Sequence, residues 1–385
     1  MRARILVTDG ETPAALAVVR SLSLAGHRVH VLAHARHASA AASRAATAIR
    51  TPDPVREPTR WMEHLVKVTS RGGFDVLLPL SDTALLLVDL IRHRIPGRIA
   101  LAMPPGGVLR QSQDKPGVLA RAGALGIPVL PCRVGREIFD APLPAVVKPA
   151  RSRSVGPDRV MASTAIVVAD KSRLVGAVRE RTQAGLGAYV EPWIPGEGRG
   201  VFLLMHDGRV LAHFAHRRIR EASPLGGPSA VAESVPQDPL LFDYSVALAR
   251  DLEIDGPFMA EFRGVEGEFV LLEVNARYWG SLALAVASGV DFPALHVAAV
   301  LGNPRPGPES YQTGVRVRNL AFDLKRTALA WCGSAAGSTI EFPGRLPALL
   351  DLLTGRAPGM ISKHGDPAAG RAHLLRLITK AVKCE

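Results

Sequence analysis

Apolar runs alternate with amphipathic stretches through the first hundred residues. Residues 5–7 form an apolar run that ends in Thr8-Asp9-Gly10, residues 13–24 have helical periodicity, and residues 29–32 form a second apolar run. The alternation continues with a helical pattern at 61–68, an apolar run at 75–79 and a helical pattern at 83–91. This order is typical of a parallel sheet with helices on its faces. We therefore predict an α/β domain over residues 1–107, because Pro104-Pro105-Gly106-Gly107 breaks both periodicities.

The pattern changes in the middle of the chain. Short apolar runs punctuated by Gly and Pro predict antiparallel strands at 144–149, 188–194, 201–205 and 210–214. We assign residues 108–302 to a second domain. Residues 303–385 form a less regular C-terminal extension with one helix predicted over 373–383. That helix has a basic amphipathic pattern that would suit a membrane surface or a partner, but a helix that caps the core is the favoured interpretation.

Composition and charge exclude several functions. The 385 residues include 47 Lys+Arg and 35 Asp+Glu, which gives a net charge of +12. The basic residues are spread along the chain and aromatic residues make up only 5%, so no basic stretch is interleaved with aromatic rings for nucleic-acid binding. The three cysteines, Cys132, Cys332 and Cys384, lack the spacing of a zinc site.

The sequence also bears on localisation. The chain starts without the apolar region of a signal peptide, and its most apolar stretch, 281–302, is interrupted by Asp291, Pro293 and His296. We therefore expect a cytoplasmic protein that binds neither nucleic acid nor a membrane.

The segment 256–277 carries the most informative set of polar residues. It predicts two strands joined by a tight turn at Glu266-Gly267, with Val270, Leu272 and Val274 on one face of the second strand and Glu273, Asn275 and Arg277 on the other. Folding the hairpin brings Glu261 to within about one residue of Glu273. Like charges across a ladder destabilise the pair, so two carboxylates beside an Asn indicate a bound hard cation such as Mg²⁺, with Mn²⁺ possible. The alternative is an exposed hairpin with a solvated polar face.

In combination, these motifs resemble the ATP-grasp superfamily, specifically its carboxylate-amine ligases. Glu261 and Glu273-Val-Asn-Ala-Arg277 match the metal-binding acids, the Asn and the following Arg of that family. Three further matches follow the family's order: Asp114-Lys115 opening a helix, Lys148 ending a strand, and Glu191-Pro-Trp-Ile194 before Pro195-Gly-Glu-Gly198. The resemblance covers about residues 1–302. It implies a pre-ATP-grasp α/β domain at 1–107, an ATP-grasp domain with lobes at about 108–187 and 188–302, and a C-terminal extension at 303–385.

The resemblance also implies a role for each matched residue. The metal ligands would be Glu261, Glu273 and Asn275. The nucleotide contacts would be Lys115 and Lys148 at the phosphates, Glu191 and Ile194 at the adenine, and Glu197 at the ribose. Arg277 and Lys148 would be the catalytic groups, because phosphoryl transfer depends on positioning and on stabilising charge on the transferred oxygens.

Substrate recognition is predicted in two segments, and two positions depart from the family pattern. Arg218 and Arg220 fall in the basic run 216–220, and Ser229 ends a flexible turn at 224–229. The loop after Lys148 reads Arg151-Ser-Arg-Ser-Val-Gly156 where the family often has several glycines, so arginine side chains would replace backbone amides at the phosphates. Ala276 stands where Pro is common, which leaves the metal ligands unchanged.

The function implied by the resemblance is an ATP-dependent ligase that joins a small-molecule carboxylate to an amine, or to a thiol, through an acyl phosphate and releases ADP and phosphate. A homodimer is possible. One alternative is a non-catalytic ATP- or metabolite-binding protein with the same fold. Another is an NAD(P)-dependent oxidoreductase, which is disfavoured because the turn at 9–13 has one glycine where a dinucleotide fingerprint has three.

Overall fold

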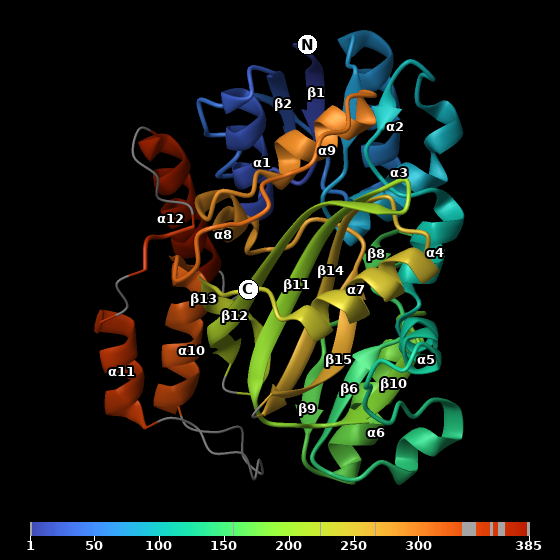
Figure 1. Cartoon of the computed structure of the whole chain (residues 1–385), viewed down its shortest axis with the longest axis vertical. Coiled ribbons are helices and arrows are strands. Elements are labelled where there is room, and N and C mark those ends of the chain that lie inside the picture. Colours follow the sequence, from blue (N-terminus) through green and yellow to red (C-terminus); the bar gives the residue numbers. More distant parts are fainter. Residues whose placement is uncertain are drawn as a thin grey trace.

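The computed structural model describes residues 2–156, 158–223, 225–265, 267–332, 344–354, 357–360 and 366–382. Pro224, Glu266 of the predicted turn, Cys384, and Lys383 at the end of the predicted C-terminal helix lie outside these residues. The structure confirms the predicted fold class, a parallel-sheet domain followed by a two-lobed α+β domain and a C-terminal extension (Figure 1).

The N-terminal domain, blue to cyan in Figure 1, is built on a five-stranded parallel sheet of order β3-β2-β1-β4-β5. Its strands are β1 (Arg4–Val7), β2 (Arg28–Ala33), β3 (Thr47–Arg50), β4 (Val76–Leu78) and β5 (Ala100–Leu101), and its helices are α1 (Pro13–Leu24), α2 (Pro58–Gly72) and α3 (Asp82–Leu90). Thr12 and Ser81 cap α1 and α3 because their hydroxyls accept backbone N–H groups of the first turn. The predicted strand-helix alternation is confirmed.

The first lobe of the second domain has a three-stranded antiparallel sheet of order β10-β6-β9. Its elements are α4 (Gly106–Gln113), α5 (Lys115–Ala124), β6 (Ala145–Pro149), the short hairpin β7 (Ser154–Val155) and β8 (Val160–Met161), β9 (Ile166–Val168), α6 (Lys171–Gln183) and β10 (Ala188–Pro192). Asp114 caps α5, as the sequence predicted for a helix opening at Lys115. β10 pairs with β6, so the first-lobe sheet includes the five residues 188–192, which the sequence analysis assigned to the start of the second lobe.

The second lobe is a six-stranded antiparallel sheet of order β15-β14-β11-β12-β13-β16. Its elements are β11 (Glu197–His206), β12 (Arg209–Ser223), β13 (Gly226–Ser234), α7 (Pro239–Asp251), β14 (Gly256–Val265), β15 (Glu268–Asn275), α8 (Leu282–Ala287), α9 (Phe292–Val300) and β16 (Arg316–Arg318). One face packs on α5 and α7 through residues such as Leu203 and Phe262. The other face is apolar at Phe202 and Met259, where it joins the core shared with the N-terminal domain and α8. Farther along the same face the residues are polar, and there the candidate site lies.

The C-terminal extension is more regular than the sequence predicted. It contains α10 (Leu320–Cys332), α11 (Arg345–Thr354) and α12 (Pro367–Val382), and β16 joins the large sheet beside β13. The prediction of one helix was therefore wrong for α10 and α11, which lie together at the left of Figure 1. Asp323 of α10 forms ion pairs with Arg220 and Arg318. Such long-range contacts help to hold α10 against the large sheet, and local periodicity does not reveal them. No helix among the described residues is long and apolar enough to cross a membrane.

Candidate functional site

The predicted hairpin of carboxylates is present, and its register places the two acids opposite each other. Glu261 of β14 pairs directly with Glu273 of β15, and Asn275 pairs with Met259. Glu261 is 9% exposed, and the Asn275 amide donates to Glu273 Oε1 at 3.3 Å. The structure therefore brings the three predicted metal ligands, whose oxygens are the donor type that Mg²⁺ prefers, to one end of the sheet.

A β-bulge in β15 corrects the predicted alternation. The pairing moves from Glu261–Glu273 to Phe262–Leu271, which leaves Leu272 between the two pairs. Leu271, rather than Leu272, is fully buried in the core, because a bulge shifts all following side chains to the other face. The Leu272 carbonyl accepts a hydrogen bond from Lys148 Nζ at 3.2 Å. The bulge therefore ties the second lobe to a predicted phosphate-binding lysine of the first lobe.

Each carboxylate of the pair is held by a basic side chain. Lys115 Nζ lies 2.8 Å from Glu273 Oε2, and Arg218 forms an ion pair with Glu261. Burial acts to raise the pKa of Glu273, but Lys115 and Lys148 outweigh it and lower that pKa to about 2. Burial raises the pKa of Glu261, and the neighbouring charge of Glu273 adds to the effect. These cations explain how two facing carboxylates coexist in the folded chain.

Two glycines of β11 create the space through which Arg218 reaches Glu261. Gly200 lies between His216 of β12 and Glu261 of β14, and Gly198 lies two residues away on the same face. A Cβ at Gly198 would lie 2.9 Å from Arg218 Cδ, and one at Gly200 would lie 2.6 Å from the Phe202 ring and 2.9 Å from His216 Nε2. This Gly-x-Gly pattern inside a predicted strand is a sequence signal that could have indicated the site, because glycines within a strand often mark a close approach of another group.

Replacing Gly200 with Ala is expected to destabilise the protein by about 1–3 kcal/mol, since the added methyl group overpacks against buried side chains. Urea unfolding measures this loss. The matched control is Gly176→Ala in α6, where a Cβ meets no atom within 4 Å. That control should be neutral or stabilising by up to about 1 kcal/mol, because Ala favours a helix over Gly. Equal stability of Gly200→Ala and the wild type would contradict the steric account.

Burial keeps His216 neutral, which predicts a pH dependence of stability. Its Nδ1 lies 3.3 Å from the Ser281 hydroxyl, and burial, with a smaller effect of Arg218, lowers its pKa to about 3. Below the unfolded pKa of about 6.5 the unfolded chain binds a proton that the folded chain does not, so the stability from this residue is lost as the pH falls from 6.5 towards 3. As the pH falls from 6 to 5, the free energy of unfolding of His216→Gln should therefore decrease by about 1.4 kcal/mol less than that of the wild type. Identical pH slopes for both proteins would contradict this.

Arg277 is fixed by an acid that the sequence analysis missed. Its Nε and Nη2 donate to the two carboxylate oxygens of Asp82 at 2.8 and 3.0 Å, and Nη2 also donates to Asn275 Oδ1 at 2.9 Å. Asp82 is the first residue of α3, shortly after β4. Groups beyond the carboxyl ends of parallel strands often face a ligand, and this signal could have identified Asp82 from the sequence.

Lys148 and Glu191 form a buried ion pair between β6 and β10. Glu191 is 1% exposed, and burial raises its pKa although Lys148 acts in the opposite direction. Its Oε1 accepts no hydrogen bond from the residues that the structure describes. Ile194 lies in the connection between β10 and β11, where the chain passes from one lobe to the other. An unsatisfied buried acceptor beside this connection suits a ligand that carries an amino group.

Three residues that the sequence analysis assigned to ligand binding do not lie among the polar side chains around Glu261 and Glu273. Glu197 bonds Arg199 at 2.7 Å and lies on the face of β11 opposite to Gly198 and Gly200. Arg220 is bound by both carboxylate oxygens of the buried Asp323, at 2.9 and 2.8 Å. Ser229 of β13 lies opposite Glu221 of β12 in the sheet, and the Glu221 carboxylate accepts a hydrogen bond from Arg218 at 2.9 Å. Ser229 is therefore linked to the site only through Glu221.

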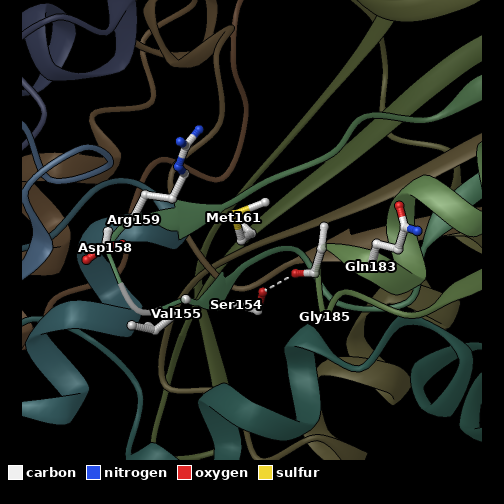
Figure 2. A pocket seen from close by; sticks show the side chains of 9 residues that line it. Ser154, Val155, Asp158, Arg159, Met161, Gln183 and Gly185 are labelled. Carbon is white, nitrogen blue, oxygen red and sulfur yellow. Dashed lines mark hydrogen bonds between the residues drawn. The ribbon is translucent and has the colours of Figure 1, made fainter.

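The loop after Lys148 folds into the β7–β8 hairpin. A pocket of about 420 Å³ lies between this hairpin and the end of α6 (Figure 2). The Ser154 hydroxyl donates a hydrogen bond to the Ala184 carbonyl there, at 2.8 Å. Val155, Met161 and Gln183 contribute to its lining. Lys115, Lys148 and Glu191 do not line it. The pocket is therefore distinct from the polar group described above.

Comparisons with known proteins give a family match within the second domain and similar folds among solved structures. Residues 188–322 match the family described as "ATP-grasp in the biosynthetic pathway with Ter operon". This range contains Glu191, Arg218, both acids of the hairpin and Arg277. The comparison with curated proteins gave no match.

Several solved structures are similar in fold over most of the chain. Biotin carboxylase from Campylobacter jejuni has a TM-score of 0.64 at 17% identity, over 82% of this chain and 74% of that chain. An N5-carboxyaminoimidazole ribonucleotide synthetase, solved as an ADP complex, has a TM-score of 0.64 at 15% identity, over 91% and 96%. L-amino acid ligase from Bacillus licheniformis has a TM-score of 0.57 at 17% identity, over 79% and 75%. At these identities the superpositions show a shared fold.

Proposed function

We propose that this protein is an ATP-dependent ligase that joins a small-molecule carboxylate to an amine, because residues 188–322 match an ATP-grasp family and the chain shares the fold of the solved structures above. The reaction would pass through an acyl phosphate and release ADP and phosphate. The observation that carries the proposal is the direct pairing of Glu261 with Glu273, with Asn275 and Arg277 beside them and Lys115 and Lys148 facing them from the first lobe.

The donor set fits a divalent cation. Two carboxylates and one amide oxygen at one end of a sheet are hard ligands, and the basic side chains that now pair with the acids show that positive charge is favoured there. Glu261, Glu273 and Asn275 would hold Mg²⁺ or Mn²⁺. When bound, the metal would offset the charge that develops on the phosphate oxygens.

The remaining groups are assigned by their positions. Lys115 and Lys148 would bind the phosphates as point charges from a helix start and a strand end. Glu191, with its unsatisfied Oε1, and the backbone of Ile194 would bind the adenine between the lobes. Glu197 and Arg220 are engaged elsewhere and are assigned no ligand contact.

Arg218 is the group best placed for the carboxylate substrate. It reaches Glu261 across the glycines of β11, and Glu221 bonds it from the other side. With Glu261 as a metal ligand, the Arg218 guanidinium would be released from that partner and could bind a carboxylate through two parallel hydrogen bonds. Arg277, beside the metal ligands, would face the transferred phosphate.

A nucleotide titration followed by an assay of ADP release tests the proposal. Mg²⁺ with ATP should raise the melting temperature, since a ligand that binds only the folded chain stabilises it, while NADH and NADPH should not. ADP release with a panel of small carboxylates should then depend on adding an amine. Stabilisation by a nicotinamide nucleotide alone, or ATP binding without turnover across the panel, would favour the oxidoreductase or the binding protein instead.

A further inference from the structure

The first turn of α3, in the N-terminal domain, contacts two arginines of the ATP-grasp domain. Asp82 binds Arg277 through both carboxylate oxygens, and Thr83 Oγ1 accepts a hydrogen bond from Arg153 Nε at 3.0 Å. Arg153 belongs to the loop that has arginines where glycines are common. One guanidinium group from each lobe of the ATP-grasp domain therefore contacts one of two consecutive residues of the N-terminal domain.

The N-terminal domain holds this turn rigidly. Asp9 follows β1 with a positive φ of 60°, and its carboxylate accepts hydrogen bonds from the Ser81 hydroxyl at 2.6 Å and the Ser81 N–H at 3.1 Å. Ser81 caps α3 directly before Asp82. The carboxylate of Asp82 is therefore set by the sheet and the helix start, and its orientation does not depend on Arg277 alone.

The β7–β8 hairpin is anchored to the same domain. The Val160 N–H donates to the Val55 carbonyl at 2.8 Å, and Val160 is 2% exposed within the core cluster of the N-terminal domain. Arg153 also donates to the Ser152 carbonyl at 2.6 Å. A backbone hydrogen bond and the buried Val160 side chain therefore hold the hairpin against the N-terminal domain, and the contacts of Arg153 hold its guanidinium group.

Most N–H donors of the Arg277 guanidinium are already used in hydrogen bonds within the protein. Nε and Nη2 donate to Asp82, Nη2 donates to Asn275, and Nη1 donates to the Tyr278 carbonyl at 3.0 Å. These contacts use four of the five N–H donors of a guanidinium. Among the described contacts, one donor on Nη1 remains, and its direction is fixed by the other four.

We infer that the N-terminal domain completes the phosphate-binding site, with Asp82 as the positioning residue of Arg277 and Thr83 as that of Arg153. This inference rests on the proposed function. Asp82 acts through Arg277, so it is a positioning residue without a ligand contact of its own. Holding a charged donor in one orientation matters because a misplacement of about 1 Å in an active site can lower the reaction rate about a hundredfold.

A double-mutant cycle on nucleotide affinity tests the inference. The affinity for Mg²⁺ with the non-hydrolysable analogue AMP-PNP is measured by calorimetry for the wild type, Asp82→Asn, Arg277→Met and the double variant. Asp82→Asn should weaken binding about 10-fold, and it should add less than about 2-fold once Arg277 is replaced. Independent, multiplicative effects of the two substitutions would overturn the inference.

The control is Asp366→Asn, which breaks another ion pair to the N-terminal domain, with Arg20 at 2.9 Å. It should lower the melting temperature without changing AMP-PNP affinity, whereas Asp82→Asn should change the affinity. If Asp82→Asn does not fold, Thr83→Val and Arg153→Met form a second cycle with the same expectation. No binding by the wild type would refute the proposed function; binding that Asp82→Asn or Thr83→Val leaves unchanged would refute only the inference.

Discussion

Replacing Glu273 with Gln is expected to abolish ligase turnover, with a loss of at least about a thousandfold, while the fold stays intact. Gln has nearly the same shape but removes the charge of an acid whose pKa is lowered to about 2, because Lys115 and Lys148 outweigh the effect of burial. The site would then lose an anionic metal ligand at the point where the phosphate charge develops. The fold should survive because the repulsion between Glu261 and Glu273 disappears together with the ion pair to Lys115. ADP release with an accepted substrate pair measures the loss.

The control for this prediction is Glu268→Gln. Glu268 begins the same strand and is exposed, so its substitution should leave turnover unchanged. ADP release by Glu273→Gln at a rate near that of the wild type would show that the facing acids do not hold a catalytic metal.

Replacing Lys148 with Met is expected both to destabilise the protein and to remove most of its nucleotide affinity. The substitution leaves the buried Glu191 carboxylate without its partner, and breaking a buried ion pair in this way costs about 3–5 kcal/mol. It also removes the ammonium group that donates to the Leu272 carbonyl and that we propose binds the phosphates. Urea unfolding and AMP-PNP titration measure the two effects separately.

A second substitution separates structure from function. Lys148→Met combined with Glu191→Gln removes the unpaired charge, so stability should recover while affinity stays at least about 100-fold weaker. Lys171→Met, at the exposed start of α6, should change neither property. AMP-PNP affinity equal to that of the wild type in the double variant would exclude Lys148 from the phosphate site.

The hairpin of acids could be predicted from the sequence because its determinants are local. A tight turn and a period of two fix which residues of β14 and β15 face each other, and the predicted neighbourhood of Glu261 and Glu273 is confirmed. The bulge at Leu272 could not be predicted. Leu271 is buried where its N–H donates to the Pro128 carbonyl at 2.8 Å, so a distant segment decides which of two adjacent leucines enters the core.

The contacts between domains were the other unpredictable part. The position of Asp82 after β4 could have marked it as a ligand-facing residue, but nothing in the sequence pairs it with Arg277, 195 positions along the chain. Likewise, Arg220 follows Arg218 by two residues in a basic run, yet only Arg218 faces the acids. Register shifts in β12 separate the two side chains, and Asp323 of α10 fixes Arg220 in the C-terminal extension. Tertiary packing, rather than residue type, decided the role of each arginine.

We propose that a carboxylate is activated as an acyl phosphate at the Glu261–Glu273 hairpin. The most direct test is to incubate the protein with Mg²⁺, ATP, hydroxylamine and a panel of amino acids and dicarboxylates, because hydroxylamine converts an acyl phosphate to a hydroxamate whatever the natural amine is. We expect hydroxamate, ADP and phosphate in equal amounts for at least one carboxylate, and none of them with Glu273→Gln. Release of AMP and pyrophosphate, or the absence of hydroxamate with every carboxylate, would contradict it.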